Sequence, residues 1–182
     1  MGAVQDVENR LLRSTSALEA AGVPYAVIGG NAVAAWVSRI DRDATRNTKD
    51  VDILLRRSDL DAAGEALERE GFVRVEVHGV PMFLDGPGGK PSQAVHILIA
   101  GERVRPEYVA PAPDVTDSER MERFQTVTLE ALVQMKLTSY RLKDRVHILD
   151  LIGVGLIDST WPPRFHPDLG RRLQELLDHP DG

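Results

Sequence analysis

Residues 25–36 of the chain read YAVIGGNAVAAW, and residues 45–55 follow as TRNTKDVDILL. In the first segment a short β-like run ends at Gly29-Gly30, and the apolar run behind it predicts a helix with Asn31 as its cap. In the second segment Asp50 opens a stretch that alternates and then becomes wholly apolar, which is typical of a strand entering a core. Together the two segments predict a strand, a tight turn, a helix and a further strand.

The second segment carries two carboxylates at a spacing that has chemical meaning. Residues two apart on a strand point to the same face, so Asp50 and Asp52 would lie side by side. Hard oxygen ligands of this kind suit magnesium, which bridges protein carboxylates to the phosphates of a substrate. An Asp-x-Asp pair also occurs at solvated strand ends, and this alternative stays open for the pair taken alone.

The glycine pair supplies the second half of a nucleotide site. Without side chains at Gly29 and Gly30, backbone amides can approach a phosphate closely, and the positive end of the following helix faces the same point. A glycine pair also serves any tight strand-to-helix connection. The glycine turn and the Asp50/Asp52 pair in combination favour a metal-bound nucleotide.

The remaining pattern indicates an α+β fold. We expect a mixed β-sheet of about four or five strands flanked by helices, with a C-terminal helical segment. The expected helices include one ending near Gly22, one between Ser58 and Gly71, and three after Thr128; the further strand candidates are residues 72–77, 81–84 and 94–100. Residues 104–118 contain several prolines and predict an irregular surface connection. We divide the chain into a core, residues 1–126, and a helical segment packed on it, residues 127–182.

Composition narrows the functional classes. The chain has no cysteine, which removes disulfides, thiolate metal sites and cysteine nucleophiles, and fits a reducing compartment. No apolar run is long enough to span a bilayer, and no secretory signal is recognisable, so we expect a cytoplasmic protein that does not act in a membrane. The formal net charge of −6 argues against broad affinity for polyanions. Several basic residues nevertheless bracket the aspartates, either to bind phosphate or as part of a solvated mixed-charge surface: Arg39, Arg42, Arg46, Lys49, Arg56 and Arg57.

A third segment, residues 127–151, reads VTLEALVQMKLTSYRLKDRVHILDL and predicts two successive helices. Lys136 lies on the apolar face of the first. It either reaches the phosphates of a substrate or lays its long stem along apolar surface.

In this order the three segments resemble the nucleotidyltransferase superfamily, particularly the small bacterial AbiEii-like and minimal nucleotidyltransferase proteins. The resemblance implies that Gly29 and Gly30 embrace the triphosphate, that Asp50 and Asp52 bind magnesium, and that Lys136 lies in the nucleotide pocket. It also implies a third carboxylate on a later strand, which helps to activate the acceptor hydroxyl.

Two positions depart from this pattern. Asn31 stands where a serine is common, and an asparagine can cap a helix and donate to phosphate in the same way. His96 stands where the third acidic residue is expected, and an imidazole does not reproduce a carboxylate at a magnesium site. His96 could act as a general base, shift the preference towards manganese, or be structural. Asp85 or Glu76 could supply a substitute carboxylate from a neighbouring strand.

Two functions follow. The first is metal-dependent transfer of a nucleoside monophosphate from a nucleoside triphosphate to an acceptor hydroxyl on RNA, protein or a small molecule; the resemblance suggests a toxin-antitoxin or defence system. The second is a catalytically impaired relative that binds a nucleotide or a protein partner through the same cleft, and His96 is the reason to consider it.

Overall fold

The structure is a computed structural model that describes residues 2–182. Its longer helices are α1 (Ala3–Ala20), α2 (Gly29–Ser38), α3 (Leu60–Arg69), α4 (Leu129–Ser139), α5 (Leu142–Gly153) and α6 (Pro167–Asp178). Its strands are β1 (Ala26–Ile28), β2 (Val51–Leu55), β3 (Val73–Val77), β4 (Val80–Leu84), β5 (Val95–Ile99), β6 (Ser118–Arg120) and β7 (Gln125–Val127). The α+β class with a helical C-terminal segment is confirmed.

All the strands join one mixed sheet in the order β3-β4-β5-β2-β1-β7-β6. Strand β2 pairs in parallel with β5 and antiparallel with β1, while β1 pairs in parallel with β7. The sheet has seven strands, so the expected four or five was too low. The difference is the hairpin of β6 and β7, whose strands are only three residues long and carry little alternating pattern.

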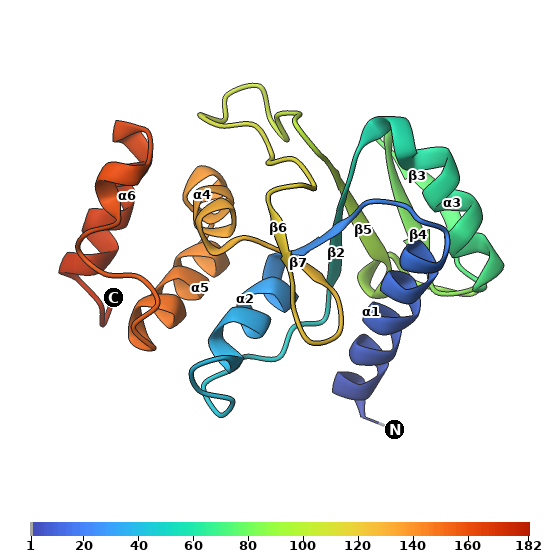
Figure 1. The fold of residues 1–182 in the computed structure, drawn as a ribbon, viewed down its shortest axis with the longest axis horizontal. Helices are drawn as coiled ribbons and strands as arrows, with labels where there is room; N and C mark the ends of the chain where they lie inside the picture. The colour runs from blue at the N-terminus through green and yellow to red at the C-terminus, as the bar shows by residue number, and fades with distance from the viewer. Residues whose placement is uncertain (1) are drawn as a thin grey trace.

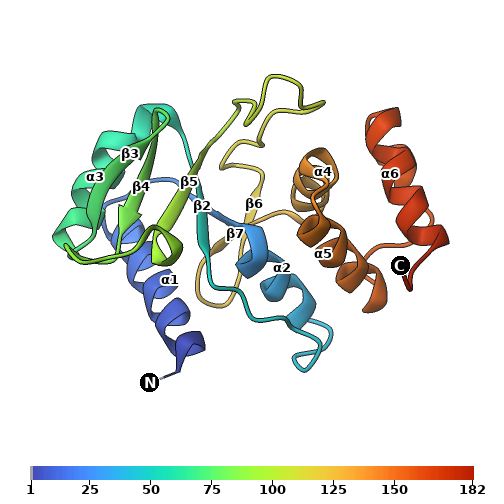
Figure 2. The same cartoon turned by 180° about the vertical axis from the view of Figure 1, so that it is seen from behind.

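Alternation along the central strands divides the core into two layers. Val51, Ile53 and Leu55 of β2 pack into one layer, against α1 and α3, while Leu54 packs into the other. In Figure 1, α1 and α3 lie on one side of the sheet and α4, α5 and α6 on the other, with α2 next to them. Figure 2 shows the same division from behind. Because Asp52 alternates with Val51 and Ile53, it faces the layer that contains α2 and α4.

The helical segment is continuous with the core of the sheet. One cluster of buried residues joins Ile28 and Val33 to Leu137 and Leu173. Strand β7 lies across the residue at which we divided the chain, and the division itself stays a prediction. None of the helices in residues 2–182 combines the length and apolar character that crossing a membrane requires.

The expected cap of α4 is confirmed, and the expected cap of α2 is wrong. The Thr128 hydroxyl accepts a hydrogen bond from the amide of Ala131 at 3.3 Å. Helix α2, in contrast, begins at Gly29, so that Asn31 lies inside its first turn and does not cap it. The amide of Asn31 is therefore available for another contact.

Candidate functional site

The glycine turn touches the aspartate pair because β1 and β2 are adjacent. Ile28 lies opposite Asp52 in the antiparallel register, so Gly29 follows directly over the carboxylate. Gly29 has φ +68°, and a Cβ atom placed there would come within 2.4 Å of the Asp52 Oδ2 atom. Only glycine allows this backbone conformation and this approach together.

Asp50 is held by the first turn of α2. The Asn31 side chain donates from Nδ2 to the Asp50 carbonyl oxygen at 2.8 Å. This contact ties the start of α2 to the residue that precedes β2. The same side-chain amide of Asn31 was expected to donate to a phosphate. A direct contact between Asn31 and a nucleotide therefore stays a prediction.

The Asp52 carboxylate is largely buried without a hydrogen bond from any side chain of residues 2–182. Burial raises the pKa of Asp52, and the neighbouring Asp50 carboxylate adds to the rise, while positive charge on His96 or Lys143 lowers it. Two adjacent carboxylates with free oxygens match the protein share of a magnesium site, which takes one or two carboxylates and completes its shell with water and substrate phosphate. The residues present therefore fit a divalent cation.

His96 lies where the third acidic residue was expected, and it is a direct neighbour of the pair. On the parallel strands β2 and β5, His96 is in register with Asp52 and faces the same layer. Nevertheless, among residues 2–182 no three acidic or histidine side chains gather closely enough to hold a metal by themselves. His96 thus borders the site without completing a protein cage.

Neither proposed substitute carboxylate joins the pair. Asp85 forms ion pairs with Arg10 and Arg13 of α1. Glu76 is exposed on β3 at the far edge of the sheet, with β4 and β5 between it and β2. Sequence reasoning could not exclude them, because the strand order decides which side chains meet.

A cavity of about 470 Å³ opens over the glycine turn and contains both aspartates and Lys136. Lys136 is only 5% exposed, and its Nζ lies 3.1 Å from Asp144 Oδ1. Burial lowers the pKa of Lys136, and the Asp144 carboxylate opposes that change. Lys136 therefore lines the predicted nucleotide pocket, and its ammonium group is paired with Asp144. This ion pair was not predicted from the sequence.

Asp144 is the centre of a buried polar network. Its side chain is fully buried and accepts hydrogen bonds from Ser139 at 2.8 Å and from the Arg141 Nε at 2.9 Å. Burial acts to raise the pKa of Asp144, but Arg141, Lys136 and Ser139 together lower it to about 2. Two cations thus share one carboxylate beside the cavity. The turn that contains Asp144 is therefore held by ion pairs within the protein.

The segment expected to be an irregular surface connection also lines the cavity. Val104, Arg105 and Tyr108 face it together with the three residues 110–112. The Arg103 guanidinium donates to the carbonyls of Tyr108 and Val109, at 3.0 and 3.4 Å, and holds this loop in shape. Nothing in its proline-rich pattern indicated that it folds back over the aspartates.

Most of the basic residues that bracket the aspartates are engaged in ion pairs. Arg46 pairs with Asp150, Arg57 with Glu102, and the other pairs are Arg39 with Glu119 and Arg56 with Asp114. Lys49, in contrast, lines the cavity over the glycine turn. The solvated mixed-charge interpretation therefore holds for most of this group.

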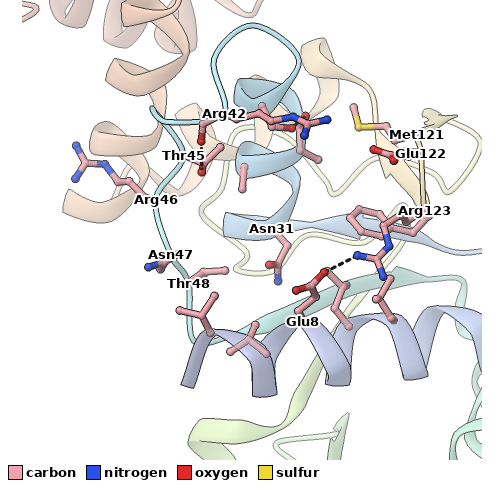
Figure 3. A pocket seen from close by; sticks show the side chains of 18 of the residues that line it. Glu8, Asn31, Arg42, Thr45, Arg46, Asn47, Thr48, Met121, Glu122 and Arg123 are labelled. Atoms are coloured by element: carbon pink, nitrogen blue, oxygen red, sulfur yellow. Dashed lines mark hydrogen bonds and ion pairs between the residues drawn. The ribbon is translucent and has the colours of Figure 1, made fainter. Parts of the chain in front are cut away.

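A separate cavity of about 510 Å³ lies between α1 and α2. Figure 3 shows it with Asn31 and Arg42 on the α2 side, and with an ion pair between Glu8 and Arg123. It shares Asn47 and Thr48 with the cavity over the glycine turn but contains neither aspartate. The chemistry described above therefore belongs to the cavity over the glycine turn.

Comparison with known proteins identifies the architecture. No protein-family model matches the sequence, and no curated protein sequence is significantly similar to it. A nucleotidyltransferase-like protein from Paracoccidioides brasiliensis is similar in structure, with a TM-score of 0.62, 20% identity, and coverage of 97% of this chain and 90% of that one. The chain has a nucleotidyltransferase fold. The antibiotic-resistance factor ANT(2'')-Ia is also similar, with a TM-score of 0.59, 14% identity, and coverage of 95% of this chain and 92% of its own.

The nucleotidyltransferase fold agrees with the resemblance seen in the sequence. Within it, Gly29, Gly30, Asp50 and Asp52 come together as the motif order implied. The roles of these residues, and those of Asn31, His96 and Lys136, stay predictions.

Proposed function

We propose that this chain transfers a nucleoside monophosphate from a nucleoside triphosphate to an acceptor hydroxyl. The observation that carries the proposal is the approach of Gly29, at the positive end of α2, to the Asp52 carboxylate inside one cavity. Amides that suit phosphate and carboxylates that suit a cation then face the same point. The structural similarity to nucleotidyltransferases supports this proposal.

Asp50 and Asp52 would hold magnesium, or manganese if His96 takes part. When bound, the cation would offset the negative charge of the phosphates. The chain's own residues orient the substrate: the amides of the glycine turn cradle the triphosphate, and Lys143 and Lys136 add positive charge to the cavity.

The acceptor oxygen forms a bond to the α-phosphorus, and the bond from that phosphorus to the bridging oxygen of the β-phosphate breaks. Pyrophosphate leaves with the electron pair. We assign the hydroxyl proton to the His96 imidazole, because His96 lies in register with Asp52 on the neighbouring strand and a neutral imidazole has a ring nitrogen that accepts a proton.

The test is incubation with each labelled nucleoside triphosphate, a panel of RNA, protein and small-molecule acceptors, and magnesium or manganese. We expect labelled product and pyrophosphate from the wild type, and at least a 100-fold lower rate from Asp50→Asn and Asp52→Asn. Asp61→Asn is the matched control, because Asp61 is an exposed carboxylate on α3, on the other side of the sheet. Equal label incorporation by wild type and both site variants would remove the aspartates from the mechanism.

A second candidate is a noncatalytic module that binds a nucleotide or a protein partner through the same cavity. It is motivated by His96 in place of a carboxylate and by the lack of a three-ligand cluster within residues 2–182. Calorimetric titration with ATP or GTP plus metal separates the candidates, since this module would bind without releasing pyrophosphate. If no nucleotide binds, the enzyme and the nucleotide sensor are both excluded, and a protein-interaction role remains.

The motif resemblance also supports an AbiEii-like grouping, with a place in a toxin-antitoxin or defence system. Induced expression in a bacterial host tests this role. Growth arrest by the wild type, but not by Asp50→Asn at equal protein level, is the expected result. Unchanged growth in both cases would contradict a toxin role.

A further inference from the structure

Asp50 and Asp52 are held in place by different parts of the protein. The register of β2 with β5 begins at Val51, and its register with β1 begins at Asp52. Asp52 therefore lies inside the sheet, with a strand on each side. Asp50 precedes both registers, at the end of a stretch, residues 45–50, that has no regular secondary structure. Contacts outside the sheet must fix the backbone of Asp50.

Two side chains supply these contacts. Asn31 donates from Nδ2 to the Asp50 carbonyl oxygen at 2.8 Å, and the Asp50 amide donates to the Thr48 hydroxyl at 3.4 Å. The first distance is that of a good hydrogen bond and the second is long, so the Asn31 contact is the stronger of the two. The peptide groups on both sides of Asp50 are thus held by side chains.

The loop that carries Asp50 is also fixed from two directions. A Cβ atom at Gly30 would come within 2.9 Å of the Thr48 Oγ1 atom, so the missing side chain lets the loop lie close to α2. From the other side, the Arg10 guanidinium of α1 donates to the Lys49 carbonyl oxygen at 3.4 Å. Arg10 is only 3% exposed and also pairs with Asp85. The position of Asp50 is therefore set by α1 and α2.

The Asn31 side chain lies behind the site. Asn31 lines the cavity between α1 and α2, whereas the residues of α2 that line the cavity over the glycine turn are Gly29 and Gly30. In Figure 3 the Asn31 side chain projects from the first turn of α2 towards α1. Its amide is already used by the Asp50 carbonyl oxygen. This geometry favours an action on Asp50 over a contact with phosphate.

A divalent cation is sensitive to the placement of its ligands. Magnesium demands near-ideal octahedral geometry with oxygens at about 2.1 Å, so two carboxylates share one cation only when their oxygens converge on one point. Contacts that orient a metal ligand typically change metal affinity by about 10- to 100-fold when they are lost. Since the sheet fixes Asp52, the separation of the two carboxylates depends on what fixes Asp50.

We propose that Asn31 is a positioning residue, which acts through the Asp50 backbone to set the separation of the Asp50 and Asp52 carboxylates and thereby the affinity of the pair for a divalent cation. The inference rests on the proposed function for the presence of that cation. It gives Asn31 a role that a serine at the same position would not perform, because a hydroxyl is one bond shorter than the carboxamide nitrogen.

The first experiment measures Mn²⁺ binding without nucleotide, from the electron paramagnetic resonance signal of the free ion. Asn31→Leu keeps the branched shape without the donor, and we expect it to raise the Kd for Mn²⁺ about tenfold. Gln125→Leu is the matched control, because the half-buried Gln125 donates from Nε2 to Ser118 at 3.0 Å and lines neither the cavity over the glycine turn nor that between α1 and α2. An equal Kd in wild type and Asn31→Leu, or no Mn²⁺ binding by the wild type, would overturn the proposal.

The second experiment separates positioning from a direct contact with phosphate. Asn31→Ser keeps a donor but is too short to reach the Asp50 carbonyl, so its Kd for Mn²⁺ should rise as in Asn31→Leu. Asn31→Gln keeps the carboxamide and should recover part of the affinity. Binding of a nucleoside triphosphate in the presence of EDTA should change less than twofold in all three variants. Wild-type Mn²⁺ affinity in Asn31→Ser, or an equal loss of metal-free nucleotide binding, would contradict the assignment.

The dependence of the transfer rate on metal concentration provides a third measurement. Asn31→Leu should need about tenfold more Mn²⁺ for its half-maximal rate, and saturating Mn²⁺ should restore most of that rate, whereas Asp50→Asn should stay inactive. The two proposals fail separately. If Asn31→Leu weakens Mn²⁺ binding but the wild type releases no pyrophosphate, transfer fails and the positioning role stands. If the wild type transfers label and Asn31→Leu keeps the wild-type Kd, transfer stands and the positioning role is wrong.

Discussion

Several residues at this site form specific contacts inside the protein, so replacing one of them should change stability by a predictable amount. Asp144 is the clearest case, because it is fully buried and forms ion pairs with both Lys136 and Arg141. Removing one partner of a buried ion pair leaves an uncompensated charge, which costs more than the pair itself contributes.

We therefore expect Asp144→Asn to lower the free energy of unfolding by about 3 kcal/mol, measured by urea denaturation. Replacing Lys136 by methionine in the same chain removes the stranded ammonium and should restore at least about 1 kcal/mol. Strictly additive losses in the double variant would show that Lys136 and Asp144 do not interact energetically.

Because His147 is partly buried, we expect the stability of the protein to depend on pH. Burial, helped by the Lys136 charge, lowers the pKa of His147 from 6.5 to about 4. As pH falls through this window the unfolded state takes up a proton that the folded state does not, so stability present above pH 6.5 is lost towards pH 4. Because the ring is not fully buried, we expect a loss of about 1–2 kcal/mol.

Urea midpoints between pH 7.5 and pH 4.5 measure this loss. His147→Gln should flatten the pH dependence, and His179→Gln should not, because His179 is exposed at the end of α6. Parallel curves for the wild type and His147→Gln would assign the pH dependence to other groups.

At the scale of elements, the turn from β1 into α2 is the most constrained connection. Gly29 combines a positive φ with a close approach to Asp52, whereas Gly71 has φ +88° with nothing within 4 Å of its Cβ position. Gly71→Ala thus isolates the cost of the backbone conformation, about 1 kcal/mol.

Gly29→Ala should lower the free energy of unfolding by more than Gly71→Ala does, because the added methyl group displaces the Asp52 carboxylate. For the same reason it should weaken metal-dependent binding of a nucleoside triphosphate by at least tenfold. Calorimetry and thermal unfolding of the two variants measure both effects. Equal nucleotide affinity in Gly29→Ala and Gly71→Ala would show that the approach to Asp52 has no bearing on binding.

Elements with strong local patterns could be predicted from the sequence, and those that depend on distant partners could not. The glycine turn, β2 and the Thr128 cap follow from local composition. Strands β6 and β7 are too short to show a period, and they exist because β1 offers an unpaired edge. The same distinction applies to the site. The place of Asp50 and Asp52 at the start of a strand could be predicted from local sequence, whereas the burial of Asp144 and the position of the loop around Tyr108 depend on tertiary packing.

At the scale of the whole molecule, one core cluster joins the sheet to the C-terminal helices. The chain carries two tryptophans, Trp36 in α2 and Trp161 before α6. The core and the helical segment therefore each contain one tryptophan whose fluorescence can be followed. The Trp36 indole also donates to the Val127 carbonyl at 3.0 Å, at the point where the two parts join.

We expect residues 2–182 to unfold as one unit. In Trp36→Phe the fluorescence of Trp161, and in Trp161→Phe the fluorescence of Trp36, should follow the same urea transition as far-UV circular dichroism of that variant. A separate, earlier Trp161 transition would show that the helical segment unfolds independently.

The parallel pairing of β1 with β7 has a consequence for how the chain reaches this structure. Val27 lies beside Thr126, with β2 to β6 intervening in the sequence. During synthesis β1 can pair with β2 early, but its other edge must wait until β7 has left the ribosome. Contacts between such distant segments slow folding, and an unpaired strand edge invites association with other chains. We therefore expect nascent chains to be most prone to aggregation just before the hairpin of β6 and β7 emerges.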